Sequence, residues 1–459
     1  MNDLKNTGKT NHFLTDDPSY SVKLREDVTV KRTGKGRIVL FRNGVKFLSI
    51  PENPLIECLL ESWMTEASVD RLIQSTTNAP AVYYLCEKLF FMGLLKGQYT
   101  SDGKSLFSMF PAPDWHSWKQ DVPISPQGLT PGVFLRNDGH CFVLEAPLSR
   151  TRCVIHDEQC LVWLMEIVRG DTPLPVENVP RMAFCRALRL MGALRHDGTP
   201  HGLWEFHDLL FFHHSSIGFH DDPIGATWRL KGKVSPEPLL KACTGECVPL
   251  AEPGGELMKK LRTPFAEVLA GRRSGRIPGN RLLTLEELGA LLYISARVQN
   301  VQEDSERFFD ISLRPSPSGG ALHSLEIYPM VRQCDGLASG AWRYDPGQHQ
   351  LESIGTDEAL LDTYLKSSPY PLVRGAGLPH IRLVITSRIL RDLWKYEKIA
   401  YRLVLQDLGC LYQTLGLTAA AMGLTSCILG AVDARRLGAI MKLDPLIEPV
   451  VGEMTVSSR

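Results

Sequence analysis

The sequence has no excess of charge of either sign. Its 459 residues include 51 Lys and Arg against 51 Asp and Glu, so the formal net charge is zero. Proteins that bind nucleic acid or acidic membranes through their phosphates usually carry a basic surplus. The balance therefore argues against nucleic-acid binding by the whole chain. A hydrophobic content of 44% and this length indicate a globular protein with more than one domain.

The sequence also lacks a secretory signal and a cysteine framework. The opening residues, MNDLKNTGKTNHFLTDD, contain no apolar core of the signal-peptide kind. The 11 cysteines are an odd number, and Cys243 and Cys247 form the only close pair, as CTGEC. Dispersed thiols are typical of reduced proteins, and one C-x3-C pair is weak evidence for zinc. We expect a cytoplasmic protein without a metal site.

One stretch, Leu408 to Val432, contains no charge and is long enough to cross a bilayer. Its apolar residues, however, recur every three or four positions, as on one face of an amphipathic helix. They are Leu405, Leu408, Tyr412, Leu415, Ala419 and Met422. The sequence therefore predicts a buried helix that ends at Gly423, and no membrane span.

The first half contains a repeat. AVYYLCEKLFFMGLLKG (81–97) aligns with RMAFCRALRLMGALRHD (181–197), which matches Cys86 to Cys185 and Gly93 to Gly192. Hairpin-like sequence and a second apolar helix precede each copy, at 28–50 with 55–64 and at 133–144 with 158–167. Strands followed by helices, the last ending at glycine, are typical of a winged helix. We predict one such module at 1–100, a linker at 101–130 and a second module at 131–202.

The matched helices do not favour DNA binding. EKLFFMGLLK is mostly apolar, and the second copy offers one stripe of arginines that a solvated face would also explain. A structural or peptide-docking use is the better interpretation. The histidine-rich segment that follows (201–220) has irregular spacing and abundant aromatics, which favours packed, hydrogen-bonded imidazoles over a metal site. Its histidines are His201, His207, His213, His214 and His220.

Two loops in the second half could hold a ligand. Arg272, Arg273, Ser274 and Arg276, in RRSGR, supply the guanidinium and hydroxyl donors that a phosphate monoester needs. In RPSPSGGALH (314–323), Pro317 stiffens the chain, Ser318 offers a hydroxyl and Gly319 allows close approach of a flat ligand. Taken singly, each has a plain alternative, a solvated basic turn and a turn before a strand.

A third element could act as a base. Lys395 and Tyr396 are adjacent, and the cationic residues Arg388, Arg391, Lys398 and Arg402 are near them in sequence. Crowded cations lower the pKa of a lysine and stabilise a phenolate, and either effect makes a general base. The alternative is a solvated helix face.

Taken in order, these elements resemble the FMN-dependent nitroreductase superfamily, and in particular its azoline-oxidising branch. The resemblance covers roughly residues 203 to 459. It rests on RRSGR (272–276), RPSPSGGALHSLEIY (314–328), AWRYDPGQHQL (341–351), WKY (394–396) and YRLVLQDLG with the residues to 424. Together with the tandem modules, which look like precursor-peptide clamps, the architecture resembles that of cyanobactin thiazoline oxidases. It implies an α+β fold with an FMN-binding oxidase domain at 203–459.

The resemblance implies a role for each matched residue. Arg272, Arg273, Ser274 and Arg276 would contact the FMN phosphate and ribityl chain, and Pro317, Ser318 and Gly319 would lie along the isoalloxazine. Lys395 and Tyr396 would be the catalytic pair. The expected reaction oxidises azolines, thiazolines foremost, to azoles in a ribosomally made precursor peptide.

The resemblance also implies partners and leaves alternatives. The superfamily places FMN at a homodimer interface, and a cyclodehydratase is a further candidate partner. Another FMN oxidoreductase acting on nitroaromatics, quinones or a different peptide bond would share the flavin residues. A non-enzymatic scaffold or a DNA-binding regulator is a third possibility. The oxidase interpretation requires the 272–276 turn and the 395–396 pair to meet, within one chain or across a subunit boundary.

Overall fold

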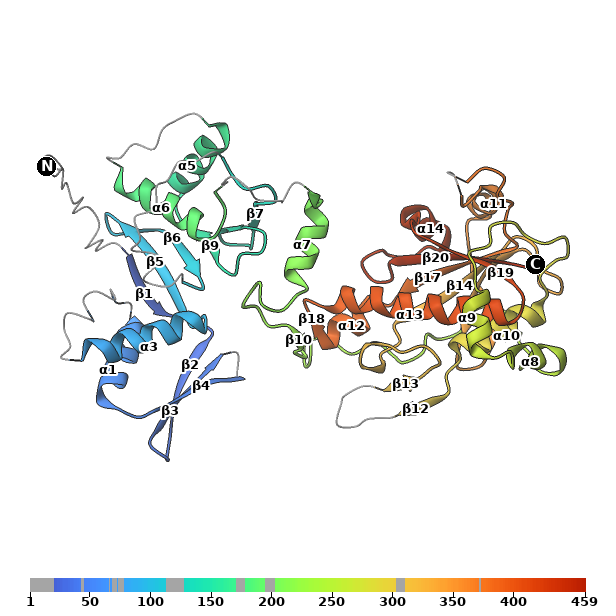
Figure 1. Cartoon of the computed structure of the whole chain (residues 1–459), viewed down its shortest axis with the longest axis horizontal. Coiled ribbons are helices and arrows are strands. Elements are labelled where there is room, and N and C mark those ends of the chain that lie inside the picture. Colours follow the sequence, from blue (N-terminus) through green and yellow to red (C-terminus); the bar gives the residue numbers. More distant parts are fainter. Residues whose placement is uncertain are drawn as a thin grey trace, which may run out of the picture. The chain divides into compact units, whose positions relative to one another are not determined.

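The computed structural model describes residues 20–42, 45–65, 67, 72, 78–112, 128–170, 178–194, 203–302, 310–370 and 373–459. The chain divides into two compact units, Met1–Asp222 and Pro223–Arg459. Each unit combines helices with antiparallel sheet (Figure 1), so the α+β prediction is confirmed. The finer division into two modules, a linker and an oxidase domain from residue 203 remains a prediction.

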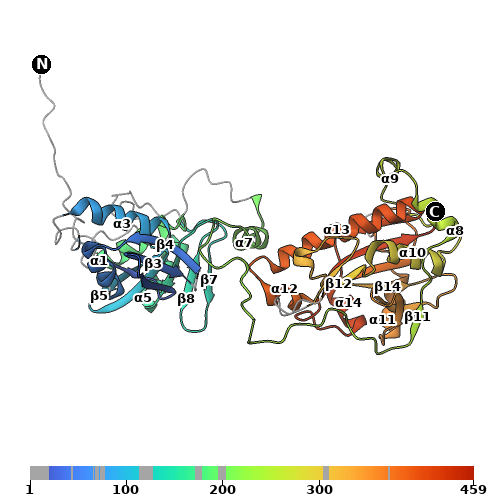
Figure 2. The same cartoon turned by 90° about the horizontal axis from the view of Figure 1, so that it is seen from below.

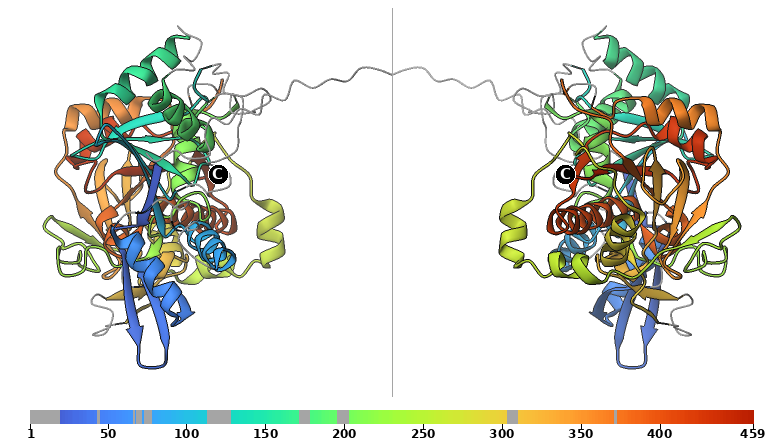
Figure 3. Two further views of the ribbon diagram at one scale, coloured as in Figure 1. Left: turned by 90° about the vertical axis from the view of Figure 1, so that its left-hand side faces the viewer. Right: turned by 90° about the vertical axis from the view of Figure 1, so that its right-hand side faces the viewer.

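The first unit is built around one six-stranded sheet and one hydrophobic core. The strand order is β1 (Tyr20–Leu24), β5 (Leu95–Ser101), β6 (Lys104–Phe110), β9 (Arg152–Ile155), β8 (Phe142–Glu145) and β7 (Phe134–Asn137). A separate three-stranded sheet contains β2 (Val28–Thr33), β3 (Arg37–Arg42) and β4 (Val45–Pro51), and its β2–β3 hairpin extends from the unit (Figure 3). Because β6 pairs with β9, the two sequence repeats share one sheet. The winged-helix interpretation of each repeat is not confirmed.

The helices of the repeat are confirmed. In α3 (Ala79–Phe91) and α6 (Val179–Leu190), an Asn side chain caps the start and a proline occupies the first turn. Gly93 and Gly192 follow in left-handed conformations, with φ of 65° and 69°, which an L side chain rarely adopts. Cys86 and Cys185 are buried at matching positions. The remaining described helices of this unit are α1 (Pro54–Thr65), α5 (Glu158–Arg169) and α7 (Phe206–His214).

The second unit contains a seven-stranded sheet between two layers of helix. Its strand order is β11 (Cys247–Pro249), β16 (Gln350–Ser353), β15 (Gly340–Asp345), β14 (Leu325–Val331), β17 (Ile381–Ser387), β20 (Val450–Ser457) and β19 (Thr425–Leu429). The strand that follows the 314–323 loop is β14, and the residues AWRYDPGQHQL (341–351) lie in the hairpin of β15 and β16. Two short ladders join β10 (Gly225–Ala226) to β18 (Tyr396–Glu397) and β12 (Asn300–Gln302) to β13 (Ile311–Leu313).

Alternate residues of β14 face the two helical layers. Ile327 and Val331 pack with α10 (Leu285–Ala296) and α13 (Ala400–Ala421) in one core cluster. Tyr328 and Met330 pack on the other face with α11 (Glu358–Lys366) and α14 (Ala434–Met441), as Figure 2 shows. The other helices are α8 (Gly255–Leu261), α9 (Phe265–Gly271), α12 (Ile389–Lys395) and the short 3-10 turn η2 (Gly319–Ala321).

Helix α13 accounts for most of the uncharged stretch. The predicted apolar face is buried at Leu408, Tyr412, Leu415 and Ala419, whereas Leu405 is 38% exposed. Gly423, with φ of 74°, follows the helix and leads the chain into β19. None of the described helices is long and apolar enough to cross a membrane. The interpretation of a core helix is confirmed, with Leu405 the exception.

Candidate functional site

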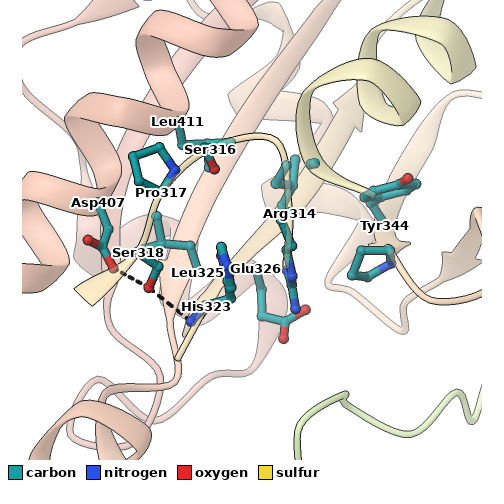
Figure 4. A pocket seen from close by; sticks show the side chains of 13 residues that line it. Arg314, Ser316, Pro317, Ser318, His323, Leu325, Glu326, Tyr344, Asp407 and Leu411 are labelled. Atoms are coloured by element: carbon teal, nitrogen blue, oxygen red, sulfur yellow. Dashed lines mark hydrogen bonds between the residues drawn. The ribbon is translucent and has the colours of Figure 1, made fainter. Parts of the chain in front are cut away.

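The loop before β14 is fastened to α13 by one carboxylate. Asp407 accepts hydrogen bonds from the Ser318 hydroxyl (2.6 Å) and from the Gly319 backbone N–H (3.0 Å). The Ser318 oxygen in turn accepts the N–H of His323 at 3.0 Å (Figure 4). The pyrrolidine ring of Pro317 stiffens the chain just before these contacts. Helix α13 therefore sets the position of the loop that the sequence predicted to face a flat ligand.

Lys395 and Tyr396 reach the same loop. Gly320 has a left-handed backbone with φ of 64°. A methyl group added there would collide with the Lys395 Nζ and the Tyr396 hydroxyl. Both polar ends thus lie against backbone that only glycine leaves open. The structure brings together the predicted loop and the predicted pair.

The charges around Tyr396 differ from the expectation. Burial, together with the carboxylates of Asp392 and Asp407, raises the pKa of Tyr396. The predicted stabilisation of a phenolate by crowded cations is therefore wrong for this tyrosine. Although the Lys395 Nζ lies 5.1 Å from its ring, burial and the two acids dominate, and Tyr396 holds its proton at neutral pH.

The arginines of α12 do not surround Lys395 as the sequence suggested. Arg388 donates to the carbonyls of Pro238 (2.8 Å) and Leu239 (2.7 Å), and its Nε lies 3.0 Å from Glu326. Arg391 likewise donates to the carbonyl of Glu237, at 2.7 Å. These buried guanidinium groups hold the 237–239 segment.

Asp392 is the most unusual acid at this site. It is fully buried on α12, where the Ser324 side chain and the charge of Arg391 only partly offset the cost of burying a carboxylate. Burial, with a contribution from the negative charge of Asp407, raises the pKa of Asp392 to about 7. Burial also raises the pKa of Asp407. Two buried acids with raised pKa values are therefore close enough to influence Tyr396.

A narrow hollow opens beside the loop (Figure 4). Burial and the positive charge of Arg314 lower the pKa of His323 to about 3, so this imidazole is neutral. The wall is mixed apolar and polar, and its members include Arg314, Ser316, Pro317, Ser318, His323, Tyr344, Asp407 and Leu411.

The 272–276 turn forms a second hollow. It follows α9, and the Gly275 N–H donates to the Ser426 carbonyl of β19 at 2.9 Å. Arg273 and Arg459 both line a hollow of about 270 Å³ at this place. Arg273 also donates to the Ala270 carbonyl (2.8 Å), while the Ser274 and Arg276 side chains are exposed. Exposed guanidinium and hydroxyl groups are suited to an anionic ligand.

The loop with Ser318 and the turn with the arginines contact different parts of α13. The loop contacts Leu403 and Asp407 near the start of the helix, and the arginine turn adjoins Ala420 and Thr425 at its end (Figure 1). At 1.5 Å per residue this separation is roughly 20–25 Å along the axis. Within one chain, the turn and the Lys395–Tyr396 pair do not meet.

The histidines of the first unit form hydrogen bonds with the protein. The rings of His213 and His214 stack at 4.8 Å, and the His213 Nδ1 accepts the Leu148 N–H at 3.0 Å. The His214 Nε2 lies 3.1 Å from Glu145. Among the described residues no group of three or more His, Cys, Asp or Glu is arranged to hold a metal. His201 lies outside the described residues.

Three residues of the site were not predicted to contribute. Asp392 and Trp228 have no motif of their own, and the indole of Trp228 lies 5.3 Å from the Lys395 Nζ. Asp407 gave one usable signal, because it is an acid on the apolar side of a helix that otherwise packs in the core.

Comparison with known proteins finds a family match within the second unit. Residues 269–456 match the Nitroreductase family. A protein of Methanocaldococcus jannaschii named as a nitroreductase is 29% identical over 188 residues, which cover 40% of this chain and 89% of that protein.

Two further relatives are named for peptide processing. The trifolitoxin-processing protein of Rhizobium leguminosarum bv. trifolii is 29% identical over 30% of this chain and 38% of its own length. The microcin B17-processing protein of Escherichia coli is 28% identical over 31% of this chain and 54% of its own length. The chain thus matches less than two thirds of either processing protein. The predicted resemblance to this branch is confirmed.

Solved structures give weak overall similarity. A nitroreductase-type protein of Ralstonia eutropha aligns over 48% of this chain and 97% of its own, with 22% identity and a TM-score of 0.34. The microcin synthetase complex of E. coli, with a truncated pro-MccB17 bound, aligns over 66% and 94%, with 18% identity and a TM-score of 0.32. No functional conclusion rests on these two similarities.

Proposed function

We propose that this chain, whose residues 269–456 form a nitroreductase domain, is an FMN-dependent oxidase of azolines in a ribosomally made peptide. The observation that carries the proposal is the approach of Lys395 and Tyr396 to the glycine of the Ser318–Gly319–Gly320 loop. The peptide-processing relatives support the substrate class. Thiazolines are the first substrate to test.

The residues present fit FMN in two parts. The 317–320 loop, with the Lys395 and Tyr396 side chains against Gly320, is the part that would face the planar ring. The second hollow, with Arg273 and Arg459 in its wall, suits a phosphate, and Arg272, Ser274 and Arg276 are next to it in the chain. We assign the first set to the isoalloxazine and the second to the phosphate.

Lys395 and Tyr396 divide the proton chemistry between them. When bound, FMN would accept the hydride that leaves the ring carbon next to the azoline Cα. The Cα proton is acidified by the adjacent carbonyl and by the C=N bond. Because Tyr396 holds its proton, its phenol donates a hydrogen bond to the azoline nitrogen, and Lys395 removes the Cα proton once its own amine is deprotonated. The ring thereby loses one proton and one hydride and becomes aromatic.

The separation of the 317–320 loop from the arginine turn along α13 supports a site that is shared by two chains. If two copies pair with their α13 helices antiparallel, the arginine turn of one lies near the Lys395–Tyr396 pair of the other. The outer side of α13 is suited to such a contact, because it is uncharged at exposed Tyr401, Leu405, Gly409 and Gln413. We therefore propose a homodimer with two composite sites.

Complementation tests this arrangement. Arg273→Ala and Lys395→Ala chains should each be inactive alone, whereas their mixed dimer contains one site with both groups intact. After unfolding and refolding together, random pairing should restore about a quarter of the parent activity. A mixture that stays inactive, although mass measurement finds mixed dimers, contradicts the shared site.

The first unit would serve as the peptide clamp. An azoline has few atoms to bind, so a tether on the rest of the peptide raises its effective concentration at the flavin. Strand addition to a free sheet edge is the mode that antiparallel sheets offer. A cyclodehydratase is the partner that would supply the azoline.

The direct test uses the purified full chain. We expect a yellow protein that releases FMN on denaturation and that removes two hydrogens from a thiazoline peptide, measured by mass spectrometry. A nitroaromatic and a quinone assayed with a reduced nicotinamide cofactor are the comparison substrates. Their rapid turnover, with an unchanged peptide, would favour a general FMN oxidoreductase, and a colourless protein would contradict both.

A further inference from the structure

Residues 225–228 hold the backbone of the Lys395–Tyr396 pair from the side. Strand β10 pairs antiparallel with β18, which sets Ala226 opposite Tyr396 and Gly225 opposite Glu397 (Figure 1). The Trp228 N–H donates to the Lys395 carbonyl at 3.1 Å. The Thr227 hydroxyl donates to the Glu397 carboxylate at 2.9 Å. This segment therefore fixes the end of α12 where both proposed catalytic side chains begin.

The indole of Trp228 continues the contact to the lysine side chain. Its ring lies 5.3 Å from the Lys395 Nζ, within the range of a cation–π interaction. The ring of Trp394 packs against Trp228 edge to face, with 5.6 Å between the ring centroids and 85° between the ring planes. The indole is half-buried, so solvent does not fully screen the contact.

The backbone of Trp228 is strained. Its φ of 56° lies in the left-handed region, which costs an aromatic residue free energy that surrounding contacts must offset. The strained turn aims the N–H of Trp228 at the Lys395 carbonyl while its ring lies over the Lys395 amine. With a relaxed backbone at this position, the Trp228 N–H and the Trp228 ring would not both contact Lys395.

We propose that Trp228 is a positioning residue for Lys395, which holds the amine beside Gly320 and stabilises the ammonium ion that forms when the amine takes a proton. The proposal rests on the proposed function, because it assumes that Lys395 is the base. A ring quadrupole interacts more strongly with the ammonium than with the neutral amine. The contact thus strengthens as charge develops, which is the condition for lowering a barrier.

The first experiment needs neither substrate nor FMN turnover. Lys395 is labelled with acetic anhydride across a pH series in the full chain, and the modified peptide is quantified by mass spectrometry. In Trp228→Leu we expect the half-point of labelling to move to lower pH, with a three- to tenfold higher rate below it. Trp228→Phe should lie between, since a phenyl ring keeps part of the interaction. Trp204→Leu, at a half-exposed tryptophan of the first unit, is the matched control.

The second experiment measures turnover of the thiazoline peptide. We expect Trp228→Leu to lower kcat by about tenfold with little change in KM, and Trp228→Phe to recover part of the loss. An unchanged labelling half-point in both variants would overturn the role of Trp228 while leaving the oxidase proposal intact. A shifted half-point together with full activity of Lys395→Ala would instead overturn the assignment of Lys395 as base.

Discussion

Glu145 of the first unit and Asp392 of the second are both buried acids, yet their surroundings are opposite. Glu145 accepts a hydrogen bond from Arg136 at 2.8 Å and lies 3.1 Å from the His214 ring nitrogen. Burial alone would raise its pKa, but these two partners lower the pKa of Glu145 to about 2. At Asp392 the Ser324 side chain and the charge of Arg391 do not outweigh burial, which raises its pKa to about 7.

The difference separates an acid that stabilises the fold from one that costs stability. A paired, ionised carboxylate contributes free energy of folding at neutral pH, whereas an acid whose partners do not outweigh its burial loses it. Strained or unsatisfied groups tend to occur where function requires them. Asp392 lies one helical turn before Tyr396, and its proximity raises the pKa of that tyrosine. We infer that Asp392 helps to keep the Tyr396 phenol protonated.

The largest effect on activity should come from Lys395 and Tyr396, the pair that follows Asp392 in the chain. Lys395→Ala and Tyr396→Phe are each expected to lower azole formation by about a hundredfold to ten-thousandfold, because a positioned proton-transfer group is lost. FMN content, read from absorbance, should stay at the parent level. Full turnover by either variant would remove that residue from the mechanism. Asp362→Asn, at an exposed ion pair with Lys366 on α11, serves as the control.

The next largest effect is on the free energy of unfolding, which the buried Asp392 carboxyl lowers to an extent that depends on pH. The folded pKa is above the unfolded value, so the folded state binds the extra proton and stability falls as pH rises from about 4 to 7. Asp392→Asn should therefore be more stable than the parent by roughly 4 kcal/mol above pH 7 and equal to it near pH 4. Hydrogen exchange of the β14 and β17 amides measures this free energy.

Asp362→Asn is the control for this series. Asp362 forms an exposed pair with Lys366 on α11, and its loss should change stability by about 0.5 kcal/mol at most. If Asp392→Asn destabilises the second unit at every pH, the partners of the carboxyl outweigh its burial, which contradicts the comparison.

Glu145 should show the reverse dependence. Its folded pKa is below the unfolded value, so the stabilisation is present above about pH 4.5 and is lost as pH falls toward 2. Glu145→Gln should destabilise the first unit by roughly 3 kcal/mol at pH 7 and by under half of that at pH 3. Urea unfolding at the two pH values measures the change. Glu256→Gln, in an exposed pair with Lys259, should change little, and an equal loss at both pH values would point to packing.

The fold was predictable where its signals are local. The asparagine caps of α3 and α6 and the capping box of Thr284 with Glu287 each depend on residues a few positions apart. The pairing of β6 with β9 depends on strands about 45 residues apart, and no motif in the sequence specifies it. The sequence therefore suggested two separate modules where the structure has one sheet.

The site was predictable as a set of residues and only partly as an environment. Ser318, Lys395 and Tyr396 were found through their motifs, and the structure brings them together. The cationic surroundings of Tyr396 were wrong, because Arg388 and Arg391 turn to carbonyls about 150 residues earlier in the chain. Sequence neighbours on a short helix do not reveal which distant backbone their side chains will reach.

The smallest expected effect is on FMN affinity and comes from Asp407, which shares features with both Glu145 and Asp392. Its carboxylate is partnered, by Ser318 and Gly319, yet burial raises its pKa. Asp407→Asn turns one acceptor oxygen into a donor facing donors, so the 317–320 loop should lose its position and FMN should bind about five- to tenfold more weakly. Fluorescence titration of FMN measures this, with Asp444→Asn, the acceptor of the Leu446 N–H on an exposed turn, as control. Unchanged FMN affinity would mean that Asp407 fastens the loop without shaping the flavin site. Asp407 would then resemble Glu145, which stabilises the fold, more than Asp392.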